Sequence, residues 1–176
     1  AMGAFGLWAS VVPMCIICHL GNFFFVPILG QVRAEFNVTA AEAGAAVTVY
    51  SLCNSLSCIV CGPLADAFGR RPTTIATLVV HLAGSAGCFF SSDLTGLVLS
   101  RGVMGLGVTG IFIMPSVVVA DAVKPEAQGK TLGNIMMLLV MGPIVGPLAA
   151  GFLSAAYGWR SVFALHCGLV VLLLAV

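Results

Sequence analysis

Long stretches without any charged side chain constrain this chain more than any other feature. Its seven basic and six acidic residues leave residues 1–32, 43–65, 72–92, 102–120, 131–159 and 161–176 uncharged. A helix that crosses a bilayer needs about 20 mainly apolar residues. Lipid cannot hydrogen-bond to the backbone, so only helices or a closed barrel can span it. The alternation of about 10 residues that marks a barrel strand is missing here. We therefore predict an all-α protein.

The composition supports a lipid environment and argues against several other classes. Hydrophobic residues make up 60% of the chain and charged residues 7%, against about 45–50% and 25% in soluble domains. The formal net charge is +1, and nucleic-acid binding needs clustered Lys and Arg. We expect the lipid bilayer as a partner and no nucleic acid. The first apolar stretch is also longer than a cleaved signal peptide.

The charges divide the chain into six predicted membrane spans. They lie at about residues 7–30, 43–63, 72–92, 94–120, 130–156 and 161–176, which form one bundle over 1–176. The last span reaches the chain end without a polar flank, so we expect the sequence to stop within its sixth helix. Thr39-Ala-Ala-Glu42 is typical of a capping box at the start of the second helix. Pro72 suits the first turn of the third.

The basic residues predict the orientation. Cytoplasmic links of membrane proteins carry more Lys and Arg than outer links. The second-to-third and fourth-to-fifth links hold four of them, and the outer links hold two: Arg70, Arg71, Lys124 and Lys130 against Arg33 and Arg160. The N-terminus and the Gly62–Pro72 link are therefore predicted to be cytoplasmic. We expect a multi-pass protein of a plasma or inner membrane.

Three motifs follow one another along the spans. The first is Gly62-x-Leu-Ala-Asp66-x-x-Gly69-Arg70-Arg71, and the second is Leu97-x-x-x-Arg101-x-x-x-Gly105-x-Gly107. The third is Gly133, eight residues, then Gly142-x-x-x-Gly146-Pro147-x-x-Ala150-Gly151. In addition, Gly62-Pro-Leu-Ala65 recurs as Gly146-Pro-Leu-Ala149. The recurrence favours two three-helix repeats, a plan known in transporters.

Together these motifs resemble the N-terminal half of a major facilitator superfamily transporter of the drug:proton antiporter type. The resemblance implies a twelve-helix fold, with a C-terminal six-helix half as partner. It implies secondary active efflux of a small organic molecule by alternating access, in exchange for protons, and no enzyme activity. Ala67, Met104 and Ala150 depart from the family pattern. Two alternatives stay open: an uptake carrier for a sugar or organic ion, and a non-transporting scaffold or receptor.

The first motif is a candidate conformational latch. Its glycines permit tight turning, and its charges can form charge-assisted pairs near the membrane surface. The resemblance implies that such a cluster holds one conformation and releases another, with members Gly62, Asp66, Gly69, Arg70, Arg71 and Asp121. The alternative is an anchor of solvated charges.

Among single residues, Arg101 gives the most specific prediction. A charge deep in a span costs about 2.5–3.5 kcal/mol on insertion scales, so it is expected to face a cavity or a partner. The alternative is that its long side chain reaches the outer interface. The first span carries His19 and Asn22 where many drug antiporters have an acid. These two lie on one helix face and, with Arg101, are candidates for proton coupling or the substrate path. A satisfied buried histidine is the alternative for His19.

The third motif lies on the fifth span. Gly142, Gly146 and Gly151 allow a neighbouring backbone to approach, and Pro143 and Pro147 are expected to bend the helix. The glycines of the fourth span, Gly102, Gly105, Gly107 and Gly110, are expected to pack in the same way. The resemblance implies that the motif Gly133, Gly142, Gly146, Pro147 and Gly151 sets transport direction and limits leak. A structural glycine interface is the alternative.

Two cysteine patterns have another interpretation. Cys15-Ile-Ile-Cys18-His19 matches a haem attachment string, and Cys53, Cys58 and Cys61 have a ferredoxin-like spacing. Both lie inside predicted membrane helices, where cysteine acts as a small apolar residue. We expect no metal and no cofactor.

Overall fold

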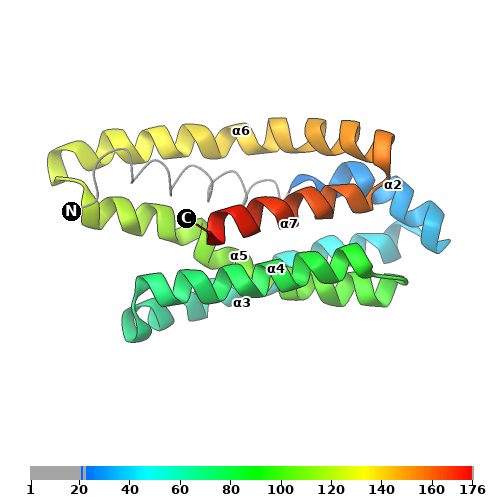
Figure 1. Ribbon diagram of the computed structural model, residues 1–176, viewed down its shortest axis with the longest axis horizontal. Helices are drawn as coiled ribbons and strands as arrows, with labels where there is room; N and C mark the ends of the chain where they lie inside the picture. Colours follow the sequence, from blue (N-terminus) through cyan, green and yellow to red (C-terminus); the bar gives the residue numbers. More distant parts are fainter. Residues whose placement is uncertain (1–20, 22, 176) are drawn as a thin grey trace.

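The described part of the molecule consists of helices. The computed structural model describes residues 21 and 23–175. Its helices are α2 (Phe25–Phe36), α3 (Ala40–Phe68), α4 (Arg70–Phe90), α5 (Leu94–Ala122), α6 (Pro125–Tyr157) and α7 (Arg160–Leu174). They run along the long axis of the molecule, with successive helices from α3 to α7 reversing direction (Figure 1). The all-α prediction is confirmed.

Several helices are suited to a bilayer. Among the described residues, α3, α4 and α6 are long and apolar enough to cross a membrane, and shorter apolar helical stretches lie at Leu94–Thr109 and Arg160–Leu174. Large apolar side chains remain exposed on their outer faces, including Ile59, Phe90 and Phe152. Water would penalise such surfaces and lipid does not. The protein is a multi-pass membrane protein.

The helix starts follow their capping signals. The Thr39 hydroxyl accepts from the Glu42 backbone N–H at 3.3 Å, and the Glu42 carboxylate accepts from the Thr39 N–H at 2.8 Å. This reciprocal pair confirms the predicted capping box. Asp93 caps α5 through the Gly96 N–H at 3.0 Å. Pro125 begins α6, where its missing N–H costs nothing.

The Gly62–Pro72 segment is not the loop that its composition predicts. Helix α3 continues through Gly62 and Pro63 to Phe68, and α4 begins at Arg70. Gly69 alone connects them, with φ of +91°, a conformation that glycine adopts without strain. One such residue is enough to reverse the chain, so the two helices extend up to it on both sides. Helix α2 ends at Phe36, beyond the predicted end of the first span near residue 30.

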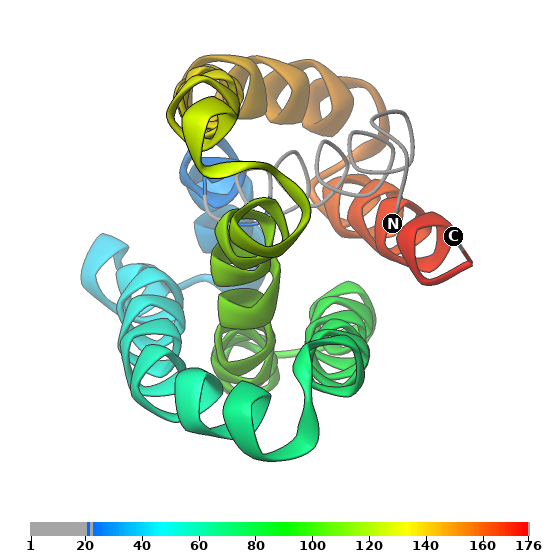
Figure 2. The ribbon, with the colours of Figure 1, turned by 90° about the vertical axis from the view of Figure 1, so that its left-hand side faces the viewer.

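Helix α5 packs with its backbone directly against α3 and α4. A Cβ atom added at Gly84 in α4 would lie 2.2 Å from the Met104 nitrogen. One added at Gly105 would lie 2.4 Å from the Tyr50 carbonyl oxygen, and one at Gly107 would lie 2.3 Å from the His81 nitrogen. The predicted close approach at the α5 glycines is therefore observed at Gly105 and Gly107. Seen along the helix axes, α5 lies among its neighbours near the centre of the bundle (Figure 2).

Two motif glycines of α6, Gly133 and Gly151, do not make such a close contact. Cβ atoms added at Gly133 and Gly151 would meet no described atom within 4 Å, so the expected approach of a neighbour at Gly151 is wrong for this part of the chain. Side chains hold α6 instead. Gln31 in α2 donates to the Ser154 carbonyl at 3.2 Å. The α6 helix lies along one side of the bundle (Figures 1 and 2).

Candidate functional site

Arg101 lies in the interior of the bundle. Its side chain is 0% exposed, which excludes the alternative that it reaches the outer interface. Its Nη1 donates to the Gly21 carbonyl oxygen at 3.1 Å. The guanidinium carbon lies 4.1 Å from the centre of the Tyr50 ring and 4.5 Å from that of Phe25. Cation–π contacts of this kind gain strength when water is excluded.

The guanidinium is only partly satisfied by the described residues. Within residues 21 and 23–175, the buried Nε and Nη2 of Arg101 have no hydrogen-bond partner. Unpaired buried donors are costly and call for an explanation. His19 and Asn22, the two candidates on the first span, lie outside the described residues. The Arg101 cation thus has donor capacity for a further acceptor. Its part in proton coupling or the substrate path stays a prediction.

Next to Arg101 lies a histidine pair that the sequence analysis did not select. The ring nitrogens His81 Nε2 in α4 and His166 Nε2 in α7 are 2.7 Å apart. His81 Nδ1 lies 2.8 Å from the Met104 carbonyl oxygen. Both histidines are buried. A signal existed for each residue singly, because an ionisable side chain within an apolar span is a functional candidate. No sequence signal indicated that His81 and His166, which are 85 residues apart, would pair.

Gly21 joins the arginine to the histidine pair. Its carbonyl accepts from Arg101, and a Cβ atom at Gly21 would lie 3.2 Å from both His166 Cε1 and the Met104 methyl group. Met104 also contacts Arg101, with 3.7 Å between Nη1 and Sδ. A side chain larger than glycine would displace the His166 ring or Met104. The chain just before α2 therefore contacts both the buried cation and the histidine pair at Gly21.

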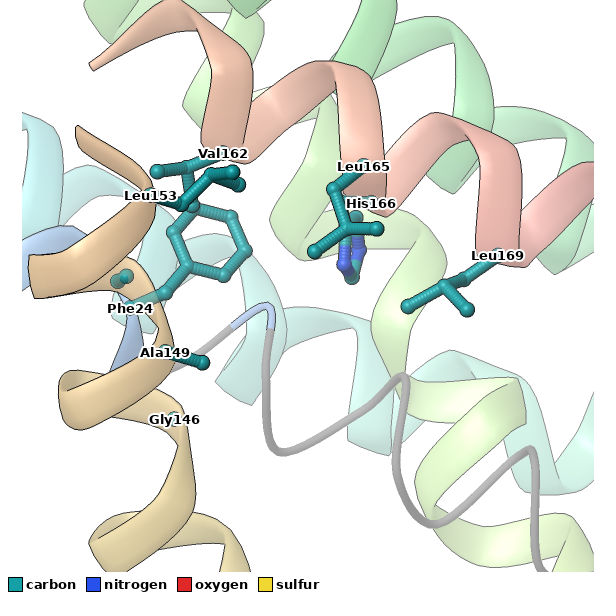
Figure 3. A pocket seen from close by; sticks show the side chains of 9 residues that line it. Phe24, Gly146, Ala149, Leu153, Val162, Leu165, His166 and Leu169 are labelled. Carbon is teal, nitrogen blue, oxygen red and sulfur yellow. The ribbon is translucent and has the colours of Figure 1, made fainter. Parts of the chain in front are cut away.

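A small hollow opens beside His166 between α6 and α7 (Figure 3). It holds about 260 Å³ of empty space, including its open mouth. Of its nine described lining residues, His166 alone has an ionisable side chain: the set is Phe24, Gly146, Ala149, Ala150, Leu153, Val162, Leu165, His166 and Leu169. Gly146 of the third motif thus borders the space that His166 reaches.

The latch residues gather at one end of the bundle. Asp66, Arg70 and Arg71 are exposed around the Gly69 link. The directions of α3, α4 and α5 bring the end of α5, which contains Asp121, to the same end (Figure 1). The Asp121 side chain lies outside the described part of the structure. Its pairing with Arg70 or Arg71 stays a prediction.

A second polar cluster closes the opposite end. Trp159 Nε1 donates to Glu35 at 2.5 Å, and Arg160 forms an ion pair with the same carboxylate. Arg160 also donates to the Ser91 carbonyl at 2.8 Å. The Trp159 hydrogen bond has the largest effect on the pKa of Glu35. Together with the hydrogen bond and charge of Arg160, it holds that pKa below its ordinary value of 4.5, although burial acts in the opposite direction. The cluster fastens α2, α7 and the end of α4 together.

The third motif is spread along α6, and the cysteines form no metal site among the described residues. Gly133, Gly142, Gly146, Pro147 and Gly151 all lie within α6, which continues through both of its internal prolines. No group of three or more His, Cys, Asp or Glu residues within the described ranges is placed to hold a metal ion. Cys15 and Cys18 lie outside those ranges.

The chain belongs to the Major Facilitator Superfamily. Residues 11–176 match the profile of that family. The chain is 28% identical over 155 residues to the probable transporter AQR1 of Saccharomyces cerevisiae, covering 88% of this chain and 26% of that protein. It is 28% identical over 160 residues to the multidrug transporter AQR1 of Candida glabrata, covering 91% and 26%. The chain thus spans about a quarter of the length of these relatives.

A solved structure shows the same fold. The crystal structure of peptide transporter POT in complex with sulfate superposes with a TM-score of 0.85 at 20% identity, covering 99% of this chain and 38% of that one. At this identity the likeness concerns the fold alone. Together with the family match over residues 11–176, it confirms the predicted major facilitator fold.

Proposed function

We propose that this chain is the N-terminal six-helix half of a secondary active transporter that exports small organic molecules in exchange for protons. Its partners would be a C-terminal six-helix half, the lipid bilayer, protons and the organic substrate. The N-terminus and the Gly69 link would face the cytoplasm of a plasma or inner membrane. The multidrug activity in the name of the Candida glabrata relative supports the substrate class.

One observation carries the proposal: a buried arginine in α5 holds the backbone of the first helix. Arg101 is fully buried, bonds to the Gly21 carbonyl and keeps further donors unpaired by the described residues. An uncompensated cation in the interior is expensive. A scaffold has no need for it. A transporter can use it, because alternating access requires helices whose contacts change with the ions bound.

Transport in liposomes tests the proposal. The full-length protein is reconstituted, and vesicles with an acidic interior are given ethidium, whose permanent charge prevents passive distribution by a pH gradient. Protons leaving should drive ethidium accumulation several-fold above that in vesicles without a gradient, and a protonophore should abolish it. Flux that ignores the gradient would refute proton antiport.

A variant pair connects this transport to the site. Arg101→Ala should lower gradient-driven ethidium accumulation at least tenfold, because the tie to Gly21 is lost. Ser55→Ala is the matched control, since Ser55 is exposed on α3 and bonds only within its own helix, at 3.0 Å to Ser51 O. Equal transport by Arg101→Ala and Ser55→Ala would show that Arg101 has no part in it.

A further inference from the structure

The histidine pair has a proton arrangement that its contacts determine. The Met104 carbonyl can only accept a hydrogen bond, so His81 Nδ1, 2.8 Å away, carries a proton. In the neutral ring, His81 Nε2 is then a bare acceptor. The 2.7 Å contact between the two Nε2 atoms therefore requires the proton to sit on His166 Nε2. The neutral pair consists of two different tautomers.

This pair of tautomers leaves one ring nitrogen, His166 Nδ1, without a proton. With its Nε2 protonated, neutral His166 has a lone pair on Nδ1. That atom is buried and has no hydrogen-bond partner among the described residues. His166 is itself 1% exposed and borders the hollow between α6 and α7. An unpaired acceptor in the interior is costly, and a proton is the smallest species that would satisfy it.

We propose that the His81–His166 pair is the proton-binding site of this half of the transporter, and that it takes one proton at His166 Nδ1. This inference rests on the proposed proton coupling. The proton binds to an existing lone pair, so no bond breaks, and its charge is shared through the Nε2–H···Nε2 hydrogen bond. A second proton is excluded, because it would put two N–H groups face to face across 2.7 Å.

Charge repulsion connects the pair to the first helix. Arg101 and His81 both contact Met104, and Gly21 touches His166 while it accepts from Arg101. Like charges in a low-dielectric interior repel. A protonated pair therefore opposes the Arg101 cation and weakens its hold on the Gly21 carbonyl. Loss of the proton restores that hold, which makes the position of the first helix depend on the charge of the pair.

No described carboxylate is buried beside the pair. The described acidic residues are all exposed: Glu35, Glu42, Asp66, Asp93 and Glu126. Among the described residues, the titratable and charged groups that face the site are Arg101 on α5, Tyr50 on α3, Cys88 on α4 and Cys167 on α7, whose Sγ lies 3.3 Å from Ser85 Oγ. Of the described uncharged side chains that face the site, histidine is the type whose unperturbed pKa lies nearest neutral pH.

Nitrogen-15 NMR of histidine-labelled full-length protein in bilayers tests the pair without any transport assay. At high pH, His81 should show the Nδ1–H tautomer and His166 the Nε2–H tautomer, with signals assigned by His81→Gln and His166→Gln. On acidification His166 Nδ1 should gain the proton and the pair should gain one proton in total. Matching tautomers in the two rings, or rings that stay neutral from pH 9 to pH 4.5, would overturn the proposal.

Transport by His166→Gln separates coupling from a purely structural role. The Gln side-chain N–H can still donate to His81, but it does not titrate. Ethidium exchange across vesicles at equal pH should stay within about threefold of wild type, while gradient-driven accumulation falls at least tenfold. Accumulation that persists in His166→Gln would overturn the histidine proposal and leave antiport intact. A wild type without gradient-driven flux would instead refute the antiport proposal, and the NMR titration would still decide whether the pair binds a proton.

Discussion

Gly84, Gly105 and Gly107 of α4 and α5 differ sharply from Gly133 and Gly151 of α6. At Gly84, Gly105 and Gly107 the backbone of a neighbouring helix lies where a side chain would begin. At Gly133 and Gly151 the space around the backbone holds no described atom. Both sets belong to long apolar helices, so the sequence alone does not distinguish one set from the other. In the first set glycine allows helices to touch, and in the second it leaves a face of α6 without a described partner.

This difference shows that a glycine motif identifies a possible contact and not its partner. On one side of the bundle, which we call the tight side, the backbone of α5 contacts α3 and α4. This packing also positions His81 and Met104, because Gly107 lies against the His81 backbone. The open side belongs to α6, which carries the antiporter-type motif. Rigid packing thus surrounds the buried polar groups, while Gly133 and Gly151 of the motif have open space beside them in the described chain.

The strongest test of the tight side is Gly107→Ala. The new methyl group would lie within 2.3 Å of the His81 nitrogen and 2.5 Å of the Thr77 carbonyl oxygen. Both are backbone atoms, so α4 and α5 must separate. We expect a loss of about 3 kcal/mol or more in the free energy of unfolding, measured by thermal unfolding in detergent. Gly168→Ala is the matched control, since its Cβ meets nothing within 4 Å. Equal stabilities would contradict the backbone contact.

A smaller effect is expected where side chains, not backbones, join the helices. Glu35→Gln removes the carboxylate that binds Trp159 and Arg160. Because the pKa of Glu35 is lowered in the folded state, its contribution is fully present above about pH 4.5 and is lost as the pH falls through that lowered pKa. The carboxylate is partly exposed, so this contribution stays below about 1 kcal/mol.

The pH dependence of stability provides the measurement. The stability difference between wild type and Glu35→Gln should shrink as the pH is lowered from 6 to 3. Glu42, whose pKa is also lowered by its hydrogen bonds to Thr39, is present in both proteins and cancels in the difference. A difference that stays constant over this range would show that the Glu35 carboxylate contributes no stability to the end cluster.

The smallest effect is expected on the open side, at Gly151→Ala. Nothing described lies within 4 Å of the added methyl group, and alanine favours a helix interior by about 0.8–1.0 kcal/mol over glycine. The free energy of unfolding of the present chain should therefore be unchanged or slightly raised. A loss above about 1 kcal/mol would mean that α6 has a close partner at this face. The same variant in the full-length protein reports whether the other half supplies one.

The sequence predicted the local events well because each depends on residues close together in the chain. The capping box at Thr39, the start of α4 beside Pro72 and the apolar helices all follow from spacing and composition. It was less reliable at the Gly62–Pro72 segment. Turn-forming residues there predicted a loop, whereas a single left-handed glycine was enough and the rest stayed helical.

By itself, the sequence determined that this chain is a helical membrane protein of the major facilitator type and that Arg101 is an intramembrane charge. Those conclusions depend on local hydrophobicity and on motifs within single helices. Only the tertiary structure decided that Arg101 binds the first helix, that His81 meets His166, and which glycines have a neighbour. Each of these joins residues on different helices, and a near-uniform apolar sequence does not specify which faces meet.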